Sequence, residues 1–171
     1  FTDMVGYTAM MQEDEEHAKS LRDRHRKVLE DCTLMHQGKV VQYFGDGTLT
    51  IFGSVVEAVL CAIEIQIELR KDPVVELRIG IHSGDIVYDD DGVFGDCVNI
   101  AARIEASAVG GAVLISRKVY EEISNHKEIS AVSLGFHQFK NVKSPIEVYA
   151  IKHESLKIPV AASTETLVGA K

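Results

Sequence analysis

The sequence predicts an α+β fold of the ferredoxin-like type, in which elements in the order βαββαβ form an antiparallel sheet with helices on one face. Three observations support this prediction. Apolar residues recur every three or four positions in several segments, which is typical of amphipathic helices. Apolar and polar residues alternate elsewhere, as in half-buried strands. Gly45-Asp46-Gly47 lies between two β-rich runs and predicts a tight hairpin.

The chain is expected to open with the end of a strand at residues 1–4 and a short helix begun by residues 5–8. Residues 12–16, four of which are acidic, start a longer helix, where the helix dipole favours acids, and Gly38 is expected to end it. The apolar stripe of this helix is formed by Ala18, Leu21, His25, Val28, Cys32 and Met35. His25 within that stripe is interpreted as a packed core histidine rather than a ligand.

A third helix is predicted after the hairpin, with Ser54 as its N-cap and Asp72-Pro73 as its stop. Its predicted buried face consists of Val56, Val59, Leu60, Ile63 and Ile67. The alternation in residues 75–82 then indicates a half-buried strand. His82 in this strand has no nucleophile or acid placed beside it by sequence, so a structural role is favoured.

Three aspartates precede Gly92 at positions 89–91. Their spacing does not match a calcium-binding EF-hand loop, so a solvated turn is predicted. Residues 93–99 then lead into a helix that ends at Gly110-Gly111. The apolar positions of that helix are Ile100, Ala101, Ile104 and Ala108.

A small α/β extension completes the predicted domain. It consists of a short strand, a short helix and two further strands, at residues 113–115, 116–123, 129–139 and 146–152. One domain is therefore expected over residues 1–152, followed by a linker or tail over residues 153–171.

Composition narrows the functional class. The 171 residues suit one domain with a core. A net charge of −8 argues against binding to nucleic acid and to membrane surfaces. No stretch approaches the roughly 20 apolar residues of a membrane span. Cys32, Cys61 and Cys97 are far apart and are expected to be reduced core residues of a cytoplasmic protein. The start at Phe1 suggests a fragment of a longer chain, with a regulatory domain, and any membrane anchor, elsewhere.

Two aspartates carry the predicted chemistry. In a βαββ sheet the first strand lies beside the hairpin, so Asp3 and Asp46 are expected to be neighbours. Asp46 taken alone would be an ordinary turn residue. Neighbouring carboxylates repel unless they are protonated or bridged by cations. A few hard oxygen ligands suit Mg²⁺ or Mn²⁺ held jointly with substrate phosphates.

A predicted anion site follows Asp3 directly. Val5, Gly6, Tyr7 and Thr8 open a helix, whose free N–H groups and dipole attract phosphate, and Gly6 lets the phosphate approach closely. Metal-binding carboxylates beside a phosphate cradle indicate metal-assisted phosphoryl chemistry.

The chain resembles a known family at several motifs. The three main signatures of the class III adenylate/guanylate cyclase catalytic domain are similar to residues 1–8, 44–47 and 95–103. The family's C-terminal pattern is similar to residues 134–142 and 145–149. The motifs occur in the family's order and spacing. The resemblance implies a nucleotidyl cyclase in signal transduction, which converts ATP or GTP to a 3′,5′-cyclic nucleotide and pyrophosphate.

The resemblance also implies roles for single residues. Asp3 and Asp46 would hold two ions of Mg²⁺ or Mn²⁺ per site, with help from the carbonyl of Met4. One ion would activate the ribose 3′-hydroxyl, and the other would bind the triphosphate. Asn99 would orient the ribose, and Arg103 would stabilise charge on the α-phosphate; their spacing of four places both on one helix face.

A lysine and a second chain complete the implied site. Lys140 matches the lysine that contacts the phosphates, and Lys143 is a nearby alternative. In this family the site forms between two chains. One supplies the metal aspartates, and the other supplies the residues for the base, the ribose and the transition state. The resemblance therefore implies a homodimer with two equivalent sites.

The chain departs from the family at the positions that select the base. Adenylate cyclases usually carry Lys, and guanylate cyclases Glu, where this chain has Gln42. The partner position is Gly92, which has no side chain, and Asp91 beside it is the alternative. A Gln amide both donates and accepts hydrogen bonds, so it can meet adenine or guanine. ATP is the preferred substrate in this interpretation.

Two other functions compete with an active cyclase. Gln42 and Gly92 favour a weak cyclase-like domain that binds nucleotide or dimerises for regulation. The retained metal and transition-state residues favour catalysis instead, because binding alone does not need them. A diguanylate cyclase shares the sheet plan, but its Gly-Gly-Asp/Glu-Glu-Phe hairpin is replaced here by Gly45-Asp46-Gly47.

Overall fold

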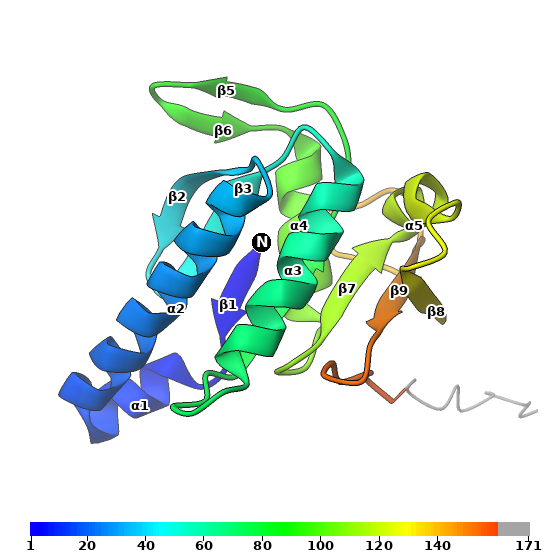
Figure 1. Ribbon diagram of the computed structural model, residues 1–171. Helices are drawn as coiled ribbons and strands as arrows, with labels where there is room; N and C mark the ends of the chain where they lie inside the picture. Colours follow the sequence, from blue (N-terminus) through cyan, green and yellow to red (C-terminus); the bar gives the residue numbers. More distant parts are fainter. Residues whose placement is uncertain (161–171) are drawn as a thin grey trace, which may run out of the picture.

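The computed structural model describes residues 1–160, and within them one seven-stranded sheet has the strand order β2-β3-β1-β4-β7-β9-β8 (Figure 1). Its strands are β1 (Thr2–Met4), β2 (Lys39–Phe44), β3 (Gly47–Ile51), β4 (Leu77–Ile81), β7 (Val113–Ser116), β8 (Ser130–His137) and β9 (Ile146–Lys152). The separate hairpin consists of β5 (Val87–Asp89) and β6 (Gly92–Phe94). The helices are α1 (Tyr7–Glu13), α2 (Glu15–Met35), α3 (Val55–Leu69), α4 (Asp96–Ala106) and α5 (Arg117–Ile123).

The predicted fold class is confirmed. Every neighbouring strand pair of the large sheet is antiparallel except β4 with β7. The order β2-β3-β1-β4 places the first strand at the centre, between the hairpin and β4, as the ferredoxin-like plan requires. The predicted C-terminal extension adds β7, β9 and β8 to the same sheet instead of forming a separate layer.

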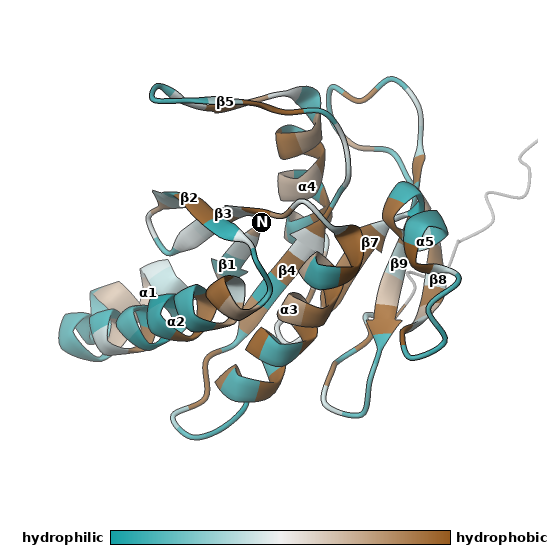
Figure 2. Cartoon of the chain, turned by 45° about the horizontal axis from the view of Figure 1, so that its top comes forward, coloured by the Kyte–Doolittle hydropathy of each residue, from teal (hydrophilic) through white to brown (hydrophobic). Residues whose placement is uncertain are grey.

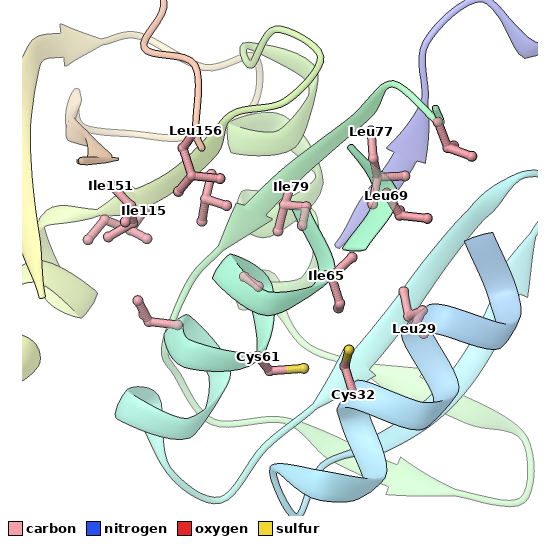
Figure 3. Close-up of a cluster of buried hydrophobic side chains, with 14 of the residues drawn as sticks. Leu29, Cys32, Cys61, Ile65, Leu69, Leu77, Ile79, Ile115, Ile151 and Leu156 are labelled. Carbon is pink, nitrogen blue, oxygen red and sulfur yellow. The ribbon is translucent and has the colours of Figure 1, made fainter. Parts of the chain in front are cut away.

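One detail differs: helices cover both faces of the sheet. Ile79 of β4 packs in the core with residues of α2 and α3, shown in Figure 3. A second apolar cluster, on the opposite face, joins Leu114 of β7 to Ile104 of α4. Neighbouring residues of a strand point to opposite faces, so Gly80 faces α4. A Cβ at Gly80 would lie 2.3 Å from the backbone nitrogen of Glu105. The glycine therefore allows the close approach of α4.

The end of α2 was predicted wrongly. The helix ends at Met35, and Gln37 takes the left-handed conformation with φ of 58°. Gly38 then donates its N–H to the carbonyl of Thr33 at 2.9 Å. A Cβ at Gly38 would lie 2.4 Å from the ring of Phe52, so this glycine serves packing and not the turn. Met35, assigned to the apolar stripe, is exposed.

The N-cap of α3 was predicted correctly, but its buried face was not. The Ser54 hydroxyl accepts a hydrogen bond from the N–H of Glu57 at 3.3 Å. Only Val59 of the predicted face is fully buried. The buried residues are Ala58, Val59, Cys61, Ala62, Ile65, Gln66 and Leu69. Figure 2 shows why: α3 is hydrophobic over much of its length, whereas α2 is mostly hydrophilic, so periodicity cannot choose a face of α3.

The two histidines have structural surroundings, as predicted. His25 is fully buried, and its Nε2 lies 3.4 Å from the hydroxyl of Thr2. Burial lowers the pKa of His25 to about 4. His82 Nδ1 bonds the hydroxyl of Ser116 at 2.7 Å, and that hydroxyl also caps α5 by accepting from Val119.

Cys32 and Cys61 lie in the core, as predicted, and point toward one another between α2 and α3 (Figure 3). Burial raises the pKa of each thiol to about 12, which keeps both protonated. Cys97, in the first turn of α4, is only partly buried, contrary to the prediction.

The segment after β9 keeps contact with the domain. Leu156 is buried, and the N–H of Lys157 donates to the carbonyl of Gly111 at 3.0 Å. Residues 161–171 of the predicted tail lie outside the described residues, so the domain boundary at residue 152 stays a prediction. Across residues 1–160, no helix has both the length and the apolar character needed to cross a membrane.

Candidate active site

Asp3 and Asp46 lie side by side in the folded chain. Asp3 is on β1, which pairs with β3. Asp46 occupies the two-residue turn that the Phe44–Gly47 pair closes. The N–H of Met4 donates a hydrogen bond of 3.1 Å to Oδ2 of Asp46. The three residues predicted to hold metal ions are therefore adjacent.

The turn that presents Asp46 depends on Gly45. This glycine has φ of 62°, a left-handed conformation that disfavours other residues. Its carbonyl accepts a hydrogen bond of 2.8 Å from Arg26 of α2. The hydrogen bond from Arg26 and the tight turn together keep the Asp46 carboxylate beside β1.

The pKa of Asp3 is raised to about 6. Burial is the largest cause, and hydrogen bonding with and repulsion from Asp46 add to it, while Arg78 opposes them. A carboxylate pair of this kind is stabilised in its ionised form by added positive charge. The pair therefore fits a hard divalent cation.

The donor set fits a cation that is shared with a ligand. Within residues 1–160 no group of three or more His, Cys, Asp or Glu side chains could enclose a metal ion. Mg²⁺ characteristically uses one or two carboxylates and completes its shell with water and phosphate oxygens. Two aspartates and a backbone carbonyl match that pattern better than a closed metal cage.

Arg78 and Glu105 belong to this site, and sequence reasoning missed both. Nη2 of Arg78 donates to Oδ2 of Asp3 at 2.8 Å, and its Nε lies 2.9 Å from Oε1 of Glu105. Burial raises the pKa of Glu105 to about 7, against the opposing charge of Arg78. Arg78 on β4 lies opposite Asp3 on β1. Predicting this pair would require the register of the two strands. The only sequence signal was an acid beside Ile104 on a buried helix face.

The residues of the predicted phosphate cradle lie at the start of α1. Gly6 is the N-cap residue of α1, so the helix starts directly after the strand that carries Asp3. The N–H of Val5, however, donates to the carbonyl of Glu76 at 2.9 Å. Val5 therefore does not offer a free N–H to phosphate, contrary to the prediction. Gly6, Tyr7 and Thr8 lie at the helix start as expected.

Asn99 and Arg103 lie on the exposed face of α4. In the described part of a single chain, no hydrogen bond or ion pair joins either residue to Asp3 or Asp46. Lys140 and Lys143 are both exposed in the loop between β8 and β9. The structure therefore does not decide which of the two lysines would contact phosphate. Among the described residues, no hydrogen bond or ion pair joins either lysine to Asp3 or Asp46.

The proposed base-selecting residues are neighbours. A Cβ on Gly92 would lie 3.7 Å from Oε1 of Gln42. The β5–β6 hairpin, of which the sequence predicted only the turn, is held over β2 by Lys39, whose ammonium lies 4.5 Å from the ring centre of Tyr88. Asp91 is exposed in the turn, and its N–H donates to Asp89.

A separate cavity of about 170 Å³ lies between β3, β4 and α3. Its lining is mostly apolar and includes Ile51, Phe52, Ala58, Ile65 and Ile79. Neither Asp3 nor Asp46 lines it. This cavity is therefore not part of the aspartate site.

Comparison with known proteins places the chain among cyclase domains. Residues 1–153 match the family described as the adenylate and guanylate cyclase catalytic domain. A protein of Rhizobium meliloti described as putative adenylate cyclase 3 is 40% identical over 155 residues, which cover 86% of this chain and 26% of that protein. The chain thus spans about a quarter of that relative.

Solved structures agree with this result. An adenylate/guanylate cyclase/hydrolase from Silicibacter pomeroyi has a TM-score of 0.76 and 32% identity, with 90% of this chain and 94% of that chain covered. Adenylate cyclases from Trypanosoma brucei, solved in their monomeric state, have a TM-score of 0.81 at 22% identity over 88% of this chain and 86% of theirs. The second likeness concerns the fold alone.

Proposed function

The chain belongs to the adenylate and guanylate cyclase catalytic domain family, and from this premise we propose that it is an active nucleotidyl cyclase that prefers ATP. The observation that carries the proposal is the Asp3–Asp46 pair at the start of α1. The raised pKa of Asp3 and the hydrogen bond from the Met4 N–H to Asp46 suit two divalent ions shared with a triphosphate. Cyclic nucleotide and pyrophosphate would be the products, in a signalling role.

Asp3, Asp46 and the carbonyl of Met4 would hold Mg²⁺ or Mn²⁺, two ions per site. When bound, the ions would lower the pKa of the ribose 3′-hydroxyl and neutralise triphosphate charge. The Met4 N–H orients Asp46 for this purpose, and Arg78 restrains Asp3. The helix start at residues 6–8 would face the phosphates.

The reaction is an in-line displacement at the α-phosphorus. The 3′-oxygen forms the new bond as the bond to pyrophosphate breaks, and the hydroxyl proton leaves to water. Arg103 would stabilise the charge that develops on the α-phosphate, Asn99 would hold the ribose, and Lys140 or Lys143 would bind phosphate oxygens.

A homodimer is part of this proposal, as the family resemblance implies. Asn99 and Arg103 are exposed on α4, and in the described residues no hydrogen bond or ion pair joins them to Asp3 or Asp46 of the same chain. A second copy would bring its α4 to the aspartates of the first. Two equivalent sites would result, each built from both chains.

Gln42 would meet the purine in this arrangement, with Gly92 leaving space beside it. The amide can pair with either base. The description of the Rhizobium meliloti relative as a putative adenylate cyclase favours ATP.

The test is product formation by the purified dimer from Mn-ATP and from Mn-GTP, with cyclic nucleotide and pyrophosphate both quantified. The D46A variant should lose the activity, because one carboxylate cannot place both ions. D31A, which removes an exposed helix aspartate paired with Lys27, should keep it. Absence of product from both nucleotides in the wild-type chain would refute the proposal.

The second candidate is a regulatory module that binds nucleotide without turnover. The missing side chain at Gly92 is the observation that favours it. Nucleotide binding measured by calorimetry, with no product formed, would support this function instead.

A further inference from the structure

Glu105 is a buried carboxylate on α4, only 5% exposed. Its backbone lies against Gly80 of β4, where a Cβ would come within 2.3 Å of the Glu105 nitrogen. Arg78 is two residues before Gly80 and therefore points to the same face of the sheet. The close contact between α4 and β4 thus places the carboxylate of Glu105 directly at the guanidinium of Arg78.

The Arg78 guanidinium is shared by two carboxylates. Its Nη2 donates to Asp3 at 2.8 Å, and its Nε lies 2.9 Å from Oε1 of Glu105. That second contact lacks the alignment of a hydrogen bond, and neither atom has another polar partner among the described residues. A buried charge without a partner is costly, so Glu105 and Arg78 depend on one another.

We propose that Glu105 is a positioning residue for the aspartate pair: by holding Arg78 it fixes Asp3 and sets the affinity of the pair for a divalent cation. The inference rests on the proposed function, since it concerns the same site. In this role Glu105 would touch neither the cation nor the nucleotide. It acts through Arg78, from the same helix that carries Asn99 and Arg103 on its exposed face.

The direction of the effect follows from charge. Replacing Glu105 by Gln removes an ionisable carboxylate close to the site. It also leaves Arg78 to pair with Asp3 alone, where the guanidinium would compete with a cation for the carboxylate. Both changes weaken cation binding. Partners in the outer shell of a metal site typically contribute about 10–100-fold in affinity.

The competing explanation is purely structural: the Arg78–Glu105 pair only ties α4 to β4. In that case E105Q would lower the unfolding temperature and leave the affinity for a cation unchanged. Cation binding by the folded protein therefore separates the two explanations.

The experiment measures the dissociation constant for Mn²⁺ alone, without nucleotide, by electron paramagnetic resonance of free Mn²⁺ with the full 171-residue chain. We expect E105Q to raise this constant about 10–100-fold. The matched control is E147Q, because Glu147 is another mostly buried glutamate in an ion pair with an arginine, Arg117, on a different part of the sheet. This control should change the constant less than about twofold, as expected for a distant, independent site.

A second variant, E105D, keeps the proposal testable if E105Q does not fold. E105D keeps the charge but shortens the side chain, so it cannot hold the 2.9 Å contact without movement. Its dissociation constant should lie between those of the wild type and E105Q. Circular dichroism and thermal unfolding without metal establish that each variant is folded.

Activity gives an independent readout. With E105Q the Mn²⁺ concentration for half-maximal activity should rise, whereas kcat at saturating Mn²⁺ should recover. The proposal is overturned if the folded E105Q or E105D chain binds Mn²⁺ as the wild type does, or if the wild type binds no Mn²⁺ at millimolar concentrations. A wild type that binds Mn²⁺ but forms no cyclic nucleotide would refute the proposed function and leave this inference standing.

Discussion

The aspartate pair and the exposed face of α4 differ in how they are held. Asp3 and Asp46 are fixed within one chain by the Met4 N–H, by Arg78 and by a turn that needs Gly45. Asn99 and Arg103 project from α4 and have no such contacts in the described residues. The first region is assembled by folding within one chain, whereas the side chains of the second are exposed. This difference is the physical reason to expect a shared site in a homodimer.

The largest expected effect breaks the comparison directly. R103A should lower activity about 10²–10³-fold, because it removes a cation aimed at developing charge, and D46A should abolish activity. If the two regions serve different chains, mixing the two inactive proteins in equal amounts should restore about a quarter of wild-type activity, since half of the dimers would contain one intact site. Activity of the mixture no greater than that of the separate variants would place both regions in one chain.

The next prediction concerns the charge of the aspartate pair. Because the pKa of Asp3 is raised from 3.8 to about 6, the folded chain between these pH values holds a proton that the unfolded chain has released. Stability of the metal-free protein should therefore fall as pH rises from about 4 to 6, by about 2 kcal/mol from this residue.

Other groups titrate in the same range, so the measurement is a difference between variants. Urea unfolding with a chelator at pH 4.5 and 7.5 should show a smaller loss of stability for D3N than for the wild type, by about 2 kcal/mol. D31N should behave as the wild type. Equal pH dependence of D3N and the wild type would contradict the raised pKa of Asp3.

A smaller effect is expected at the base. Q42K should raise the ratio of cyclic AMP to cyclic GMP about tenfold, the equivalent of one hydrogen bond. The products are quantified after reaction with an equal mixture of Mn-ATP and Mn-GTP. Q12K, on the exposed end of α1, is the matched control for the added charge. An unchanged ratio would place Gln42 outside the pocket.

The smallest effect tests the turn that presents Asp46. G45A should reduce the free energy of unfolding by about 1 kcal/mol, because Ala is disfavoured at φ of 62°. G53A is the matched control: a Cβ there also meets no atom within 4 Å, and its backbone is not left-handed. Equal stability of the two variants in urea would show that the turn is not strained by a side chain.

Sequence reasoning predicted the elements with strong local signals. The Gly45-Asp46 turn, the Ser54 cap and the last strand all have such signals, and the structure has them where they were expected. The buried face of α3 was missed because its apolar residues surround the helix. Arg78 and Glu105 were missed for another reason. Arg78 lies 75 residues after its partner Asp3, and Glu105 lies 27 residues after its partner Arg78. A local sequence pattern cannot predict pairings over such separations.

The sequence by itself determined the ferredoxin-like order of elements, the hairpin turn with its carboxylate, and the motifs that mark the family, because backbone conformation and hydrophobic periodicity act over a few residues. Only the tertiary structure decided which groups surround Asp3. Strand register placed Arg78 opposite it, and the small surface of Gly80 admitted α4 and brought Glu105 to Arg78. Burial then set the charges, since the pKa of a carboxylate depends on the solvent and ions that folding removes or supplies.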